Sequence, residues 1–349
     1  MEKLIALQKK IAPELAAVIE HRYILLRNIY FIQPIGRRTL AERLREPERY
    51  VRRELDFLRD QGLITAAAGG VSITLDGEAL LWELKDYISQ LRGLADLEGL
   101  LAAKLNLKKA VVVPGDSDQD ETVKNEIGRA AAKLLKEVLA DGNVLAVTGG
   151  TTMADVAGAL AGVFVRRNVT VVPARGGLGE EVEIQSNTIA AKIAKGLDGA
   201  YRLLHVPDDL GDEAIAAVSN EPKIREILAL LKRADVLLHG IGTAEEMASR
   251  RGMDDKEIAA LRQKEAVGEA FGYYFNRRGD CVYASSSVGI QLEDLENIPL
   301  VIAVGGGSSK AEPVLAVMSN RYQNMLVTDE GAAREILKIK ERSLKINRN

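Results

Sequence analysis

Several apolar runs in the C-terminal part of this sequence lead directly into glycines, hydroxyls and basic side chains. The clearest is the uncharged run 144–147, which continues as Thr148-Gly149-Gly150-Thr151-Thr152 into a segment with helical spacing. A strand, a tight glycine turn and a helix start leave backbone N–H groups at the positive end of a helix. These groups and the Thr hydroxyls suit phosphate oxygens. The same residues also fit an ordinary turn in which Thr151 or Thr152 caps the helix.

Three further apolar runs end in comparable residues. They are followed by Pro173-Ala174-Arg175-Gly176-Gly177, by Gly240-Ile241-Gly242-Thr243 with Arg250 beyond, and by Gly305-Gly306-Gly307-Ser308-Ser309-Lys310. In open α/β sheets, ligands bind beyond the carboxyl ends of the strands. Glycine turns joined by three cations at that edge favour an anionic metabolite, and one ligand with two phosphates would use all of them.

The elements that must position these residues form an alternating pattern beyond Asn106. Most of the apolar runs are followed by helix-like segments, which indicates an α/β fold with a doubly wound, mostly parallel sheet. The predicted strands cover residues 110–113, 144–147, 169–172, 201–206, 236–238, 299–304 and 325–327.

The N-terminal part has a different pattern. Residues 1 to about 35 have helical spacing, and two short amphipathic segments follow, 39–44 and one opened by Pro47. In the second segment Val51, Leu55 and Leu58 share one face. Arg49, Arg52 and Arg53 share the opposite face. With two short strands at 63–65 and 71–75, this order predicts a winged helix-turn-helix that binds duplex DNA.

The charge balance of this segment is weaker evidence than its order of elements. Residues 34–62 contain eight arginines and six acidic residues, so the arginine face could be a solvated surface neutralised by its own acids. Helix, turn, arginine-faced helix and wing in succession favour DNA binding over that alternative.

A third helical segment, residues 78–101, joins the two patterns. Its apolar residues could pair subunits as a short coiled coil, or the helix could be a linker packed on its own domain. The seam consists of Leu80, Leu84, Tyr87, Leu91, Leu94 and Leu101. We therefore predict a DNA-binding domain at 1–77, a linker or oligomerisation helix at 78–105 and an effector domain at 106–349.

Composition limits the remaining classes. The 349 residues are 47% hydrophobic with a net charge of −3, which is typical of a soluble two-domain protein without a uniformly basic surface. The single cysteine, Cys281, excludes a disulfide framework, and the three histidines lack ligand spacing. We expect no metal and no cofactor. Without a membrane-length apolar run or a signal peptide, we expect a cytoplasmic protein with no membrane partner.

The combination of both halves resembles the SorC family of bacterial transcription regulators over essentially the whole length. The motifs that carry the resemblance are Gly36-Arg37-Arg38-Thr39-Leu40, Arg49-Tyr50-Val51-Arg52, the four strand-end segments above and Gln185-Ser186-Asn187. Pro47 departs from the capping Ser common in related helices. The resemblance implies a repressor of an operon for triose-phosphate enzymes, induced by fructose 1,6-bisphosphate and bound as a tetramer to a two-part operator.

The resemblance also implies roles for individual residues. Phosphate would be held by Gly149, Gly150, Thr151, Thr152 and Lys310, with Arg175 and Arg250 also facing the ligand's charge. Gln185 and Glu269 would bond sugar hydroxyls, and Arg37 and Arg38 would join the DNA-binding arginines.

The effector domain also resembles the glucosamine-6-phosphate deaminase and ribose-5-phosphate isomerase fold, so a phosphosugar enzyme is the alternative. Deaminases of that group carry G-x-G-x-D-G-H, whereas this chain has Gly240-Ile241-Gly242-Thr243-Ala244-Glu245. The Asp and His that would transfer protons are missing, and Glu245 is the available substitute. We therefore predict a regulator and no enzyme.

Overall fold

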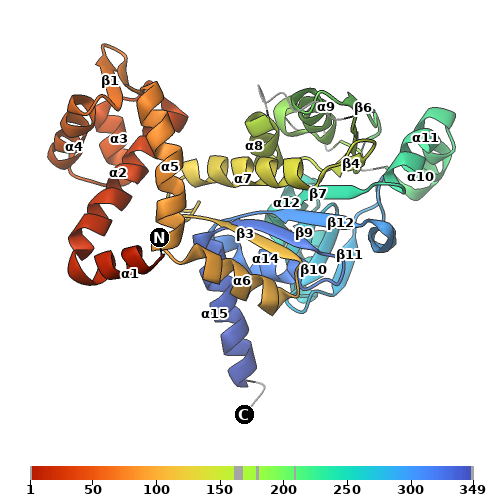
Figure 1. Ribbon diagram of the computed structural model, residues 1–349. Coiled ribbons are helices and arrows are strands. Elements are labelled where there is room, and N and C mark those ends of the chain that lie inside the picture. Colours follow the sequence, from red (N-terminus) through yellow and green to blue (C-terminus); the bar gives the residue numbers. More distant parts are fainter. Residues whose placement is uncertain (1, 161–167, 178–180, 208–209, 347–349) are drawn as a thin grey trace. The chain divides into compact units, whose positions relative to one another are not determined.

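The structure is a computed structural model that describes residues 2–160, 168–177, 181–207 and 210–346 (Figure 1). It divides into two compact units. The N-terminal unit consists of residues 1–96 and 119–123, and the C-terminal unit consists of residues 97–118 and 124–349. The N-terminal unit is therefore built from two separate stretches of chain.

The N-terminal unit begins with two helices, α1 (Glu2–Ile11) and α2 (Pro13–Ile32). The helical pattern predicted over residues 1–35 is thus divided at Ala12, whose φ of −147° is not helical. Pro13 occupies the first position of α2, where its missing N–H costs no hydrogen bond. Tyr23, Leu26 and Ile29 of α2 are fully buried in the core of the unit.

The predicted order of helix, turn, helix and wing is confirmed. Helix α3 (Arg37–Leu44) is followed by Arg45 in the left-handed conformation, with φ 54°, and then by α4 (Glu48–Asp60). Val51, Leu55 and Leu58 of α4 are buried. The wing consists of strands β1 (Ile64–Ala67) and β2 (Gly70–Ile73), paired antiparallel.

The segment after the wing contains two helices, α5 (Leu75–Leu91) and α6 (Leu94–Leu105), separated at Gly93 with φ +65°. The predicted seam packs on its own unit: Leu91 is buried in the N-terminal core, and Leu80, Leu84 and Tyr87 pack against that core. Of the two interpretations of this seam, the structure favours packing within the domain over a free coiled-coil face.

The C-terminal unit contains a seven-stranded parallel sheet in the order β3-β13-β12-β7-β4-β5-β6. Figure 1 shows α7, α8 and α9 on one side of this sheet and α14 and α15 on the other. The strands are β3 (Lys109–Val113), β4 (Val144–Val147), β5 (Thr170–Pro173), β6 (Ala200–Tyr201), β7 (Val236–Gly240), β12 (Leu300–Val304) and β13 (Met325–Asp329). The helices are α7 (Thr122–Val138), α8 (Thr151–Leu160), α9 (Ser186–Gly196), α10 (Asp212–Ser219), α11 (Pro222–Leu231), α12 (Ala244–Arg250), α13 (Asp255–Gln263), α14 (Ala311–Met318) and α15 (Glu330–Ile346), with short 3-10 turns η1 (Val182–Ile184), η2 (Leu292–Asn297) and η3 (Ser308–Lys310).

The strand predicted at 201–206 is wrong beyond Tyr201. The backbone of Leu204 is bonded to the side chain of Asn187, at 2.9 Å for its N–H and 3.0 Å for its carbonyl, instead of to β5. An amide side chain satisfies both backbone groups there, so no strand ladder is needed.

A second, antiparallel sheet in the C-terminal unit was not predicted. It has the order β11-β10-β9-β8 and consists of β8 (Gly242–Thr243), β9 (Ala266–Ala270), β10 (Tyr273–Asn276) and β11 (Cys281–Ala284). The turns between its longer strands contain Gly272 and Gly279 at positive φ. Strands this short give too few alternations to stand out in a sequence.

A buried ion pair joins the two stretches of the N-terminal unit. The guanidinium of Arg27 is 3% exposed and donates to Asp120 Oδ2 at 2.5 Å, and Asn28 Nδ2 donates to the same oxygen at 3.1 Å. Burial by itself would raise the pKa of Asp120, but the Arg27 charge and the Thr122 hydrogen bonds outweigh burial and hold that pKa below its usual value.

We predict that Asp120→Asn destabilises the protein by ~2 to 4 kcal/mol at pH 7, because the buried Arg27 charge loses its counterion. The lowered pKa makes this contribution present above the ordinary Asp range and lost as pH falls through the native pKa. The difference from wild type should therefore shrink in acid. Urea unfolding at pH 7 and in acid measures it.

The neighbouring residue Glu121 provides the control. Its pair with Arg43 is solvated, with 70% of the Glu121 side chain exposed, so Glu121→Gln should change stability by less than ~0.5 kcal/mol. Equal stability of the two variants at pH 7 would contradict the assigned role of Asp120.

Candidate functional site

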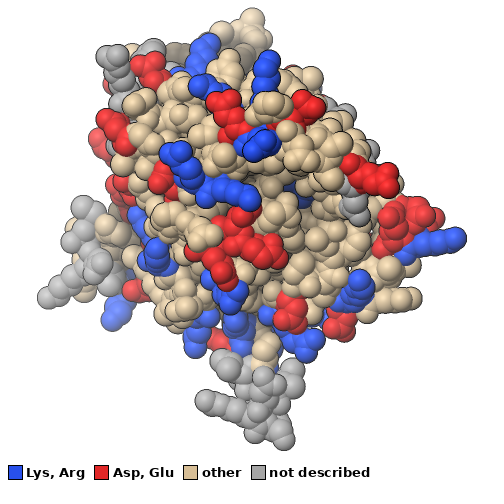
Figure 2. Space-filling view, turned by 90° about the vertical axis from the view of Figure 1, so that its right-hand side faces the viewer, with Lys and Arg blue, Asp and Glu red and all other residues tan. Residues whose placement is uncertain are grey.

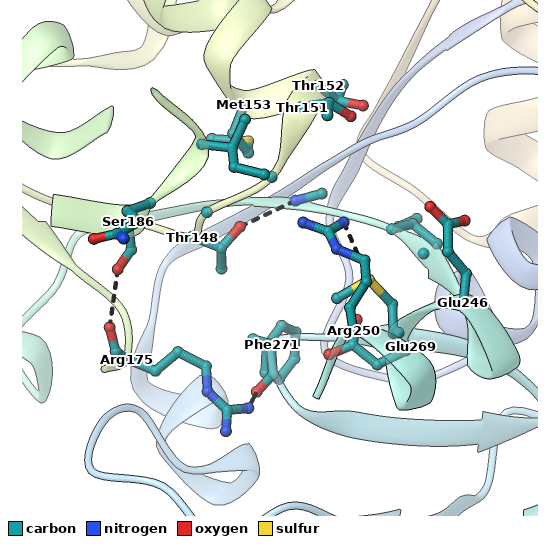
Figure 3. Close-up of a pocket in the computed structure, with 18 of the residues that line it drawn as sticks. Thr148, Thr151, Thr152, Met153, Arg175, Ser186, Glu246, Arg250, Glu269 and Phe271 are labelled. Atoms are coloured by element: carbon teal, nitrogen blue, oxygen red, sulfur yellow. Dashed lines mark hydrogen bonds between the residues drawn. The ribbon is translucent and has the colours of Figure 1, made fainter. Parts of the chain in front are cut away.

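The carboxyl ends of β4, β5, β7 and β12 meet at one cavity of the C-terminal unit, about 860 Å³ including its open mouth (Figure 3). The structure brings together at this cavity every effector residue named from the sequence: Gly149, Gly150, Thr151, Thr152, Arg175, Gln185, Arg250, Glu269 and Lys310.

The glycine turn after β4 presents a helix N-terminus to the cavity. Helix α8 begins at Thr151, and Figure 3 shows Thr151 and Thr152 side by side at this end. A Cβ at Gly149 would lie 2.7 Å from the carbonyl oxygen of Ile184, so only glycine allows this close approach. The N–H of Gly150 donates to that carbonyl at 2.8 Å. The donors that this turn offers to a ligand are therefore the backbone N–H groups in the first turn of α8.

The glycine loop after β12 differs from its prediction as an open phosphate nest. Its N–H groups are already used: Gly307 donates to Asp329, Ser308 to Asp116 and Ser309 to Asp118, at 2.8, 3.1 and 2.7 Å. What this loop gives to the cavity is the side chain of Lys310. Because its backbone is fixed by three carboxylates, the loop holds that lysine in place.

The basic side chains of the cavity have protein partners. Arg175 is buried and donates to the carbonyl of Phe271 and to Ser285 Oγ, and its guanidinium points to Phe271 in Figure 3. Lys310 Nζ lies 3.8 Å from Glu246 Oε2. Arg250 Nη1 contacts the sulfur of Met247 at 3.6 Å.

Sequence reasoning missed several residues that line this cavity. They are Met153, Ile184, Glu246, Met247, Arg251 and Phe271. With Arg251 included, four basic and two acidic side chains line the cavity, a formal charge of +2. A cavity of this charge attracts an anion.

The arginines named for DNA binding lie on α3 and α4. The side chains of Arg52 and Arg53 are 66% and 70% exposed, on the face opposite the buried Val51 and Leu55. Arg49 is also exposed. Arg37 and Arg38 lie 2.7 and 3.7 Å from the Glu48 carboxylate. Such surface pairs are weak, so a phosphate backbone can replace the carboxylates.

Figure 2 shows one face of the molecule, on which acidic and basic side chains are interspersed. This distribution agrees with the net charge of −3. Among the described residues, no helix has both the length and the hydropathy of a membrane span.

Comparisons with known proteins match both parts of the chain. The family model of a sugar-binding domain matches residues 89–338, and that of the CggR N-terminal DNA-binding domain matches residues 18–88. The central glycolytic genes regulators of Priestia megaterium and Bacillus subtilis are 47% and 44% identical, each over 97% of this chain and 99% of the relative.

Solved structures place these matches in one family. A SorC family transcriptional regulator from Enterococcus faecalis is 40% identical with a TM-score of 0.64, covering 69% of this chain and 99% of that one. The chain belongs to the SorC family of transcription regulators. The full-length sorbitol operon regulator SorC from Klebsiella pneumoniae has the same fold, with a TM-score of 0.63, 22% identity and coverage of 92% of this chain and 99% of that chain.

As a SorC family member with a DNA-binding domain, the chain is a regulator and not an enzyme. The position of Glu245 is consistent with this. Its carboxylate accepts two hydrogen bonds from Arg262, at 2.6 and 2.8 Å, and these bonds lower its pKa. A general base needs a pKa near the working pH. Glu245 is also outside the set of described residues that line the cavity.

For the DNA-binding face we predict that Arg52→Ala weakens operator binding by ~1 to 3 kcal/mol if Arg52 contacts a base edge. If it contacts a phosphate, the variant should instead reduce the salt dependence of binding. Fluorescence titrations of operator DNA at several salt concentrations distinguish the two. The control is Arg278→Ala in the C-terminal unit, whose side chain is 82% exposed. If replacing Arg49, Arg52 and Arg53 together by Ala leaves the affinity for operator DNA unchanged, this face is not the DNA-binding surface.

Proposed function

We propose that this SorC family member represses glycolytic genes, those for triose-phosphate enzymes, and that fructose 1,6-bisphosphate releases it from its operator. The name of the Priestia and Bacillus relatives supports glycolytic genes as the target. The observation that carries the effector class is the cavity, where cations and a helix N-terminus converge with a formal charge of +2.

A doubly phosphorylated sugar matches the distribution of donors in the cavity. The first turn of α8, the hydroxyls of Thr151 and Thr152 and the Lys310 ammonium suit one phosphate. Arg250 and Arg175 supply charge for the remainder of the anion. The Gln185 amide and the Glu269 carboxylate suit the hydroxyls between the phosphates.

We further propose a homo-oligomer, a tetramer on a two-part operator, acting in the cytoplasm. Two winged heads related by a two-fold axis fit two half-sites, and two such pairs fit a two-part operator. Operator DNA and phosphorylated sugars are both cytoplasmic. Sedimentation of the protein on operator fragments with one or both parts tests the assembly.

Lys310→Ala tests the proposed effector. Each charge-assisted hydrogen bond is worth ~1.5 to 3 kcal/mol, so the variant should bind fructose 1,6-bisphosphate roughly ten- to a hundredfold more weakly. Its DNA affinity without sugar should be unchanged. A ligand shifts the equilibrium between operator-bound and released protein only by binding these two states with different affinities. The variant should therefore stay on the operator at sugar concentrations that release wild type. Calorimetry and gel shifts measure the two effects.

The matched control is Lys338→Ala, since Lys338 lies on α15 in an exposed pair with Glu335. It should respond to sugar like wild type. Equal responses of Lys310→Ala and Lys338→Ala would show that the phosphate site lies elsewhere. Steady conversion of the sugar by the purified protein would contradict its role as an effector.

Glu246→Gln should have the opposite effect to Lys310→Ala. Glu246 is half-exposed and its carboxylate competes with the ligand for Lys310. Exposed pairs are worth ~0.2 to 1 kcal/mol, so the variant should bind the sugar up to about fivefold more tightly. Weaker binding, measured by calorimetry, would indicate that Glu246 contacts the sugar itself.

A further inference from the structure

The cavity contains a buried carboxylate whose charge is wrong for an anionic ligand. Glu269 lies on β9, is 3% exposed and lines the cavity. An uncompensated carboxylate at this position would repel every phosphate that enters, and burial strengthens the repulsion because little water screens it. A cavity that binds phosphorylated sugars therefore needs a way to cancel this charge.

Arg251 provides the positive charge that cancels it. Its Nη2 donates to Glu269 Oε1 at 3.0 Å, and both side chains are buried, 8% and 5% exposed. The backbone N–H of Gly272 donates to the same oxygen at 2.5 Å. The second oxygen, Oε2, lies near Gly242, which also lines the cavity: a Cβ on Gly242 would be 3.7 Å from it. One oxygen of Glu269 is thus bound to Arg251 and Gly272, while the other lies beside a second cavity-lining residue.

The guanidinium of Arg251 is itself fixed in place. Its Nη1 lies 3.4 Å from the hydroxyl of Tyr274, a fully buried side chain. Burial raises the pKa of Tyr274 to about 12, so at neutral pH the phenol carries no charge that would compete with Glu269 for Arg251. Arg250, the preceding residue, contacts Met247 instead. Two consecutive arginines at the end of α12 therefore have different partners.

We infer that Arg251 is a positioning residue for the effector: it fixes the Glu269 carboxylate in one orientation and cancels its charge, so that an acceptor for sugar hydroxyls can share the cavity with phosphate groups. This inference rests on the proposed phosphosugar effector. It assigns to Arg251 a role through Glu269, distinct from the direct contact expected of Lys310 and Arg250.

A double-mutant cycle on the full-length protein tests the inference. Arg251→Gln keeps a polar side chain but removes the charge, and it should weaken fructose 1,6-bisphosphate binding at least tenfold. Adding Glu269→Gln to that variant should restore affinity to within about threefold of Glu269→Gln alone, because no carboxylate then remains to be cancelled. Arg251→Lys should lose less than Arg251→Gln. Calorimetry measures the wild type and these four variants.

A purely structural role for Arg251 would give a different pattern. Breaking the buried pair should lower the melting temperature in either case, but under a structural role Glu269→Gln would not restore sugar binding. The charge role also predicts that Arg251→Gln weakens fructose 1,6-bisphosphate more than fructose 6-phosphate, since the second carries one phosphate. The control is Arg262→Gln, which breaks an exposed pair between Arg262 on α13 and Glu245 on α12 and should leave both affinities unchanged.

The outcomes separate this inference from the proposed effector. If wild type binds the bisphosphate and Arg251→Gln binds it equally well, or if the double variant shows no recovery, the inference is wrong while the effector stands. If wild type binds neither the bisphosphate nor inorganic phosphate, the inference about Arg251 and the proposed effector are both wrong. If wild type binds inorganic phosphate alone, and Arg251→Gln loses that binding with recovery in the double variant, the charge role holds for a different phosphate ligand.

Discussion

Charge compensation at the carboxyl end of the parallel sheet is the constraint on which the C-terminal unit depends. Four basic side chains converge there, and without compensation they would repel one another at short range. Three of them have different partners: Arg251 pairs with the buried Glu269, Lys310 pairs with the half-exposed Glu246, and Arg175 donates to a backbone carbonyl. The exposed pair is the weak one, so the rim can exchange its partner for a ligand while the buried pair keeps its own.

The two glycine-rich loops at the cavity are held by different hydrogen bonds. Asp116, Asp118 and Asp329 accept the N–H groups of the loop after β12 and so fix the backbone that carries Lys310. The glycine turn after β4 is fixed by Ile184 through one N–H. The two glycine-rich loops look alike in sequence, yet only the turn after β4 keeps its helix start open toward the cavity.

The sequence was sufficient for the helix-turn-helix with its wing, the central parallel sheet and the convergence of the strand ends. These follow from hydrophobic periodicity and from the rule that parallel strands end at one edge. It was not sufficient for contacts between distant residues. Three features join positions far apart in the chain: the Asn187 side chain that bonds Leu204, the three aspartates that accept N–H groups of the glycine loop after β12, and the Arg251–Glu269 pair. No local pattern encodes such pairs, and the short antiparallel strands that carry Glu269 gave no periodic signal.

The interleaving of the two units in the sequence has a consequence for how the protein can be divided. A fragment that ends near residue 96 retains the helix-turn-helix and wing but lacks Asp120, the carboxylate on the buried Arg27. A contiguous fragment extended to residue 123 recovers Asp120, yet it also carries β3 without β13, the strand that pairs with it. An apolar strand with unpaired edges promotes aggregation. The N-terminal unit is therefore a compact body without a clean excision point, because the carboxylate that pairs with its buried arginine follows the first strand of the other unit's sheet.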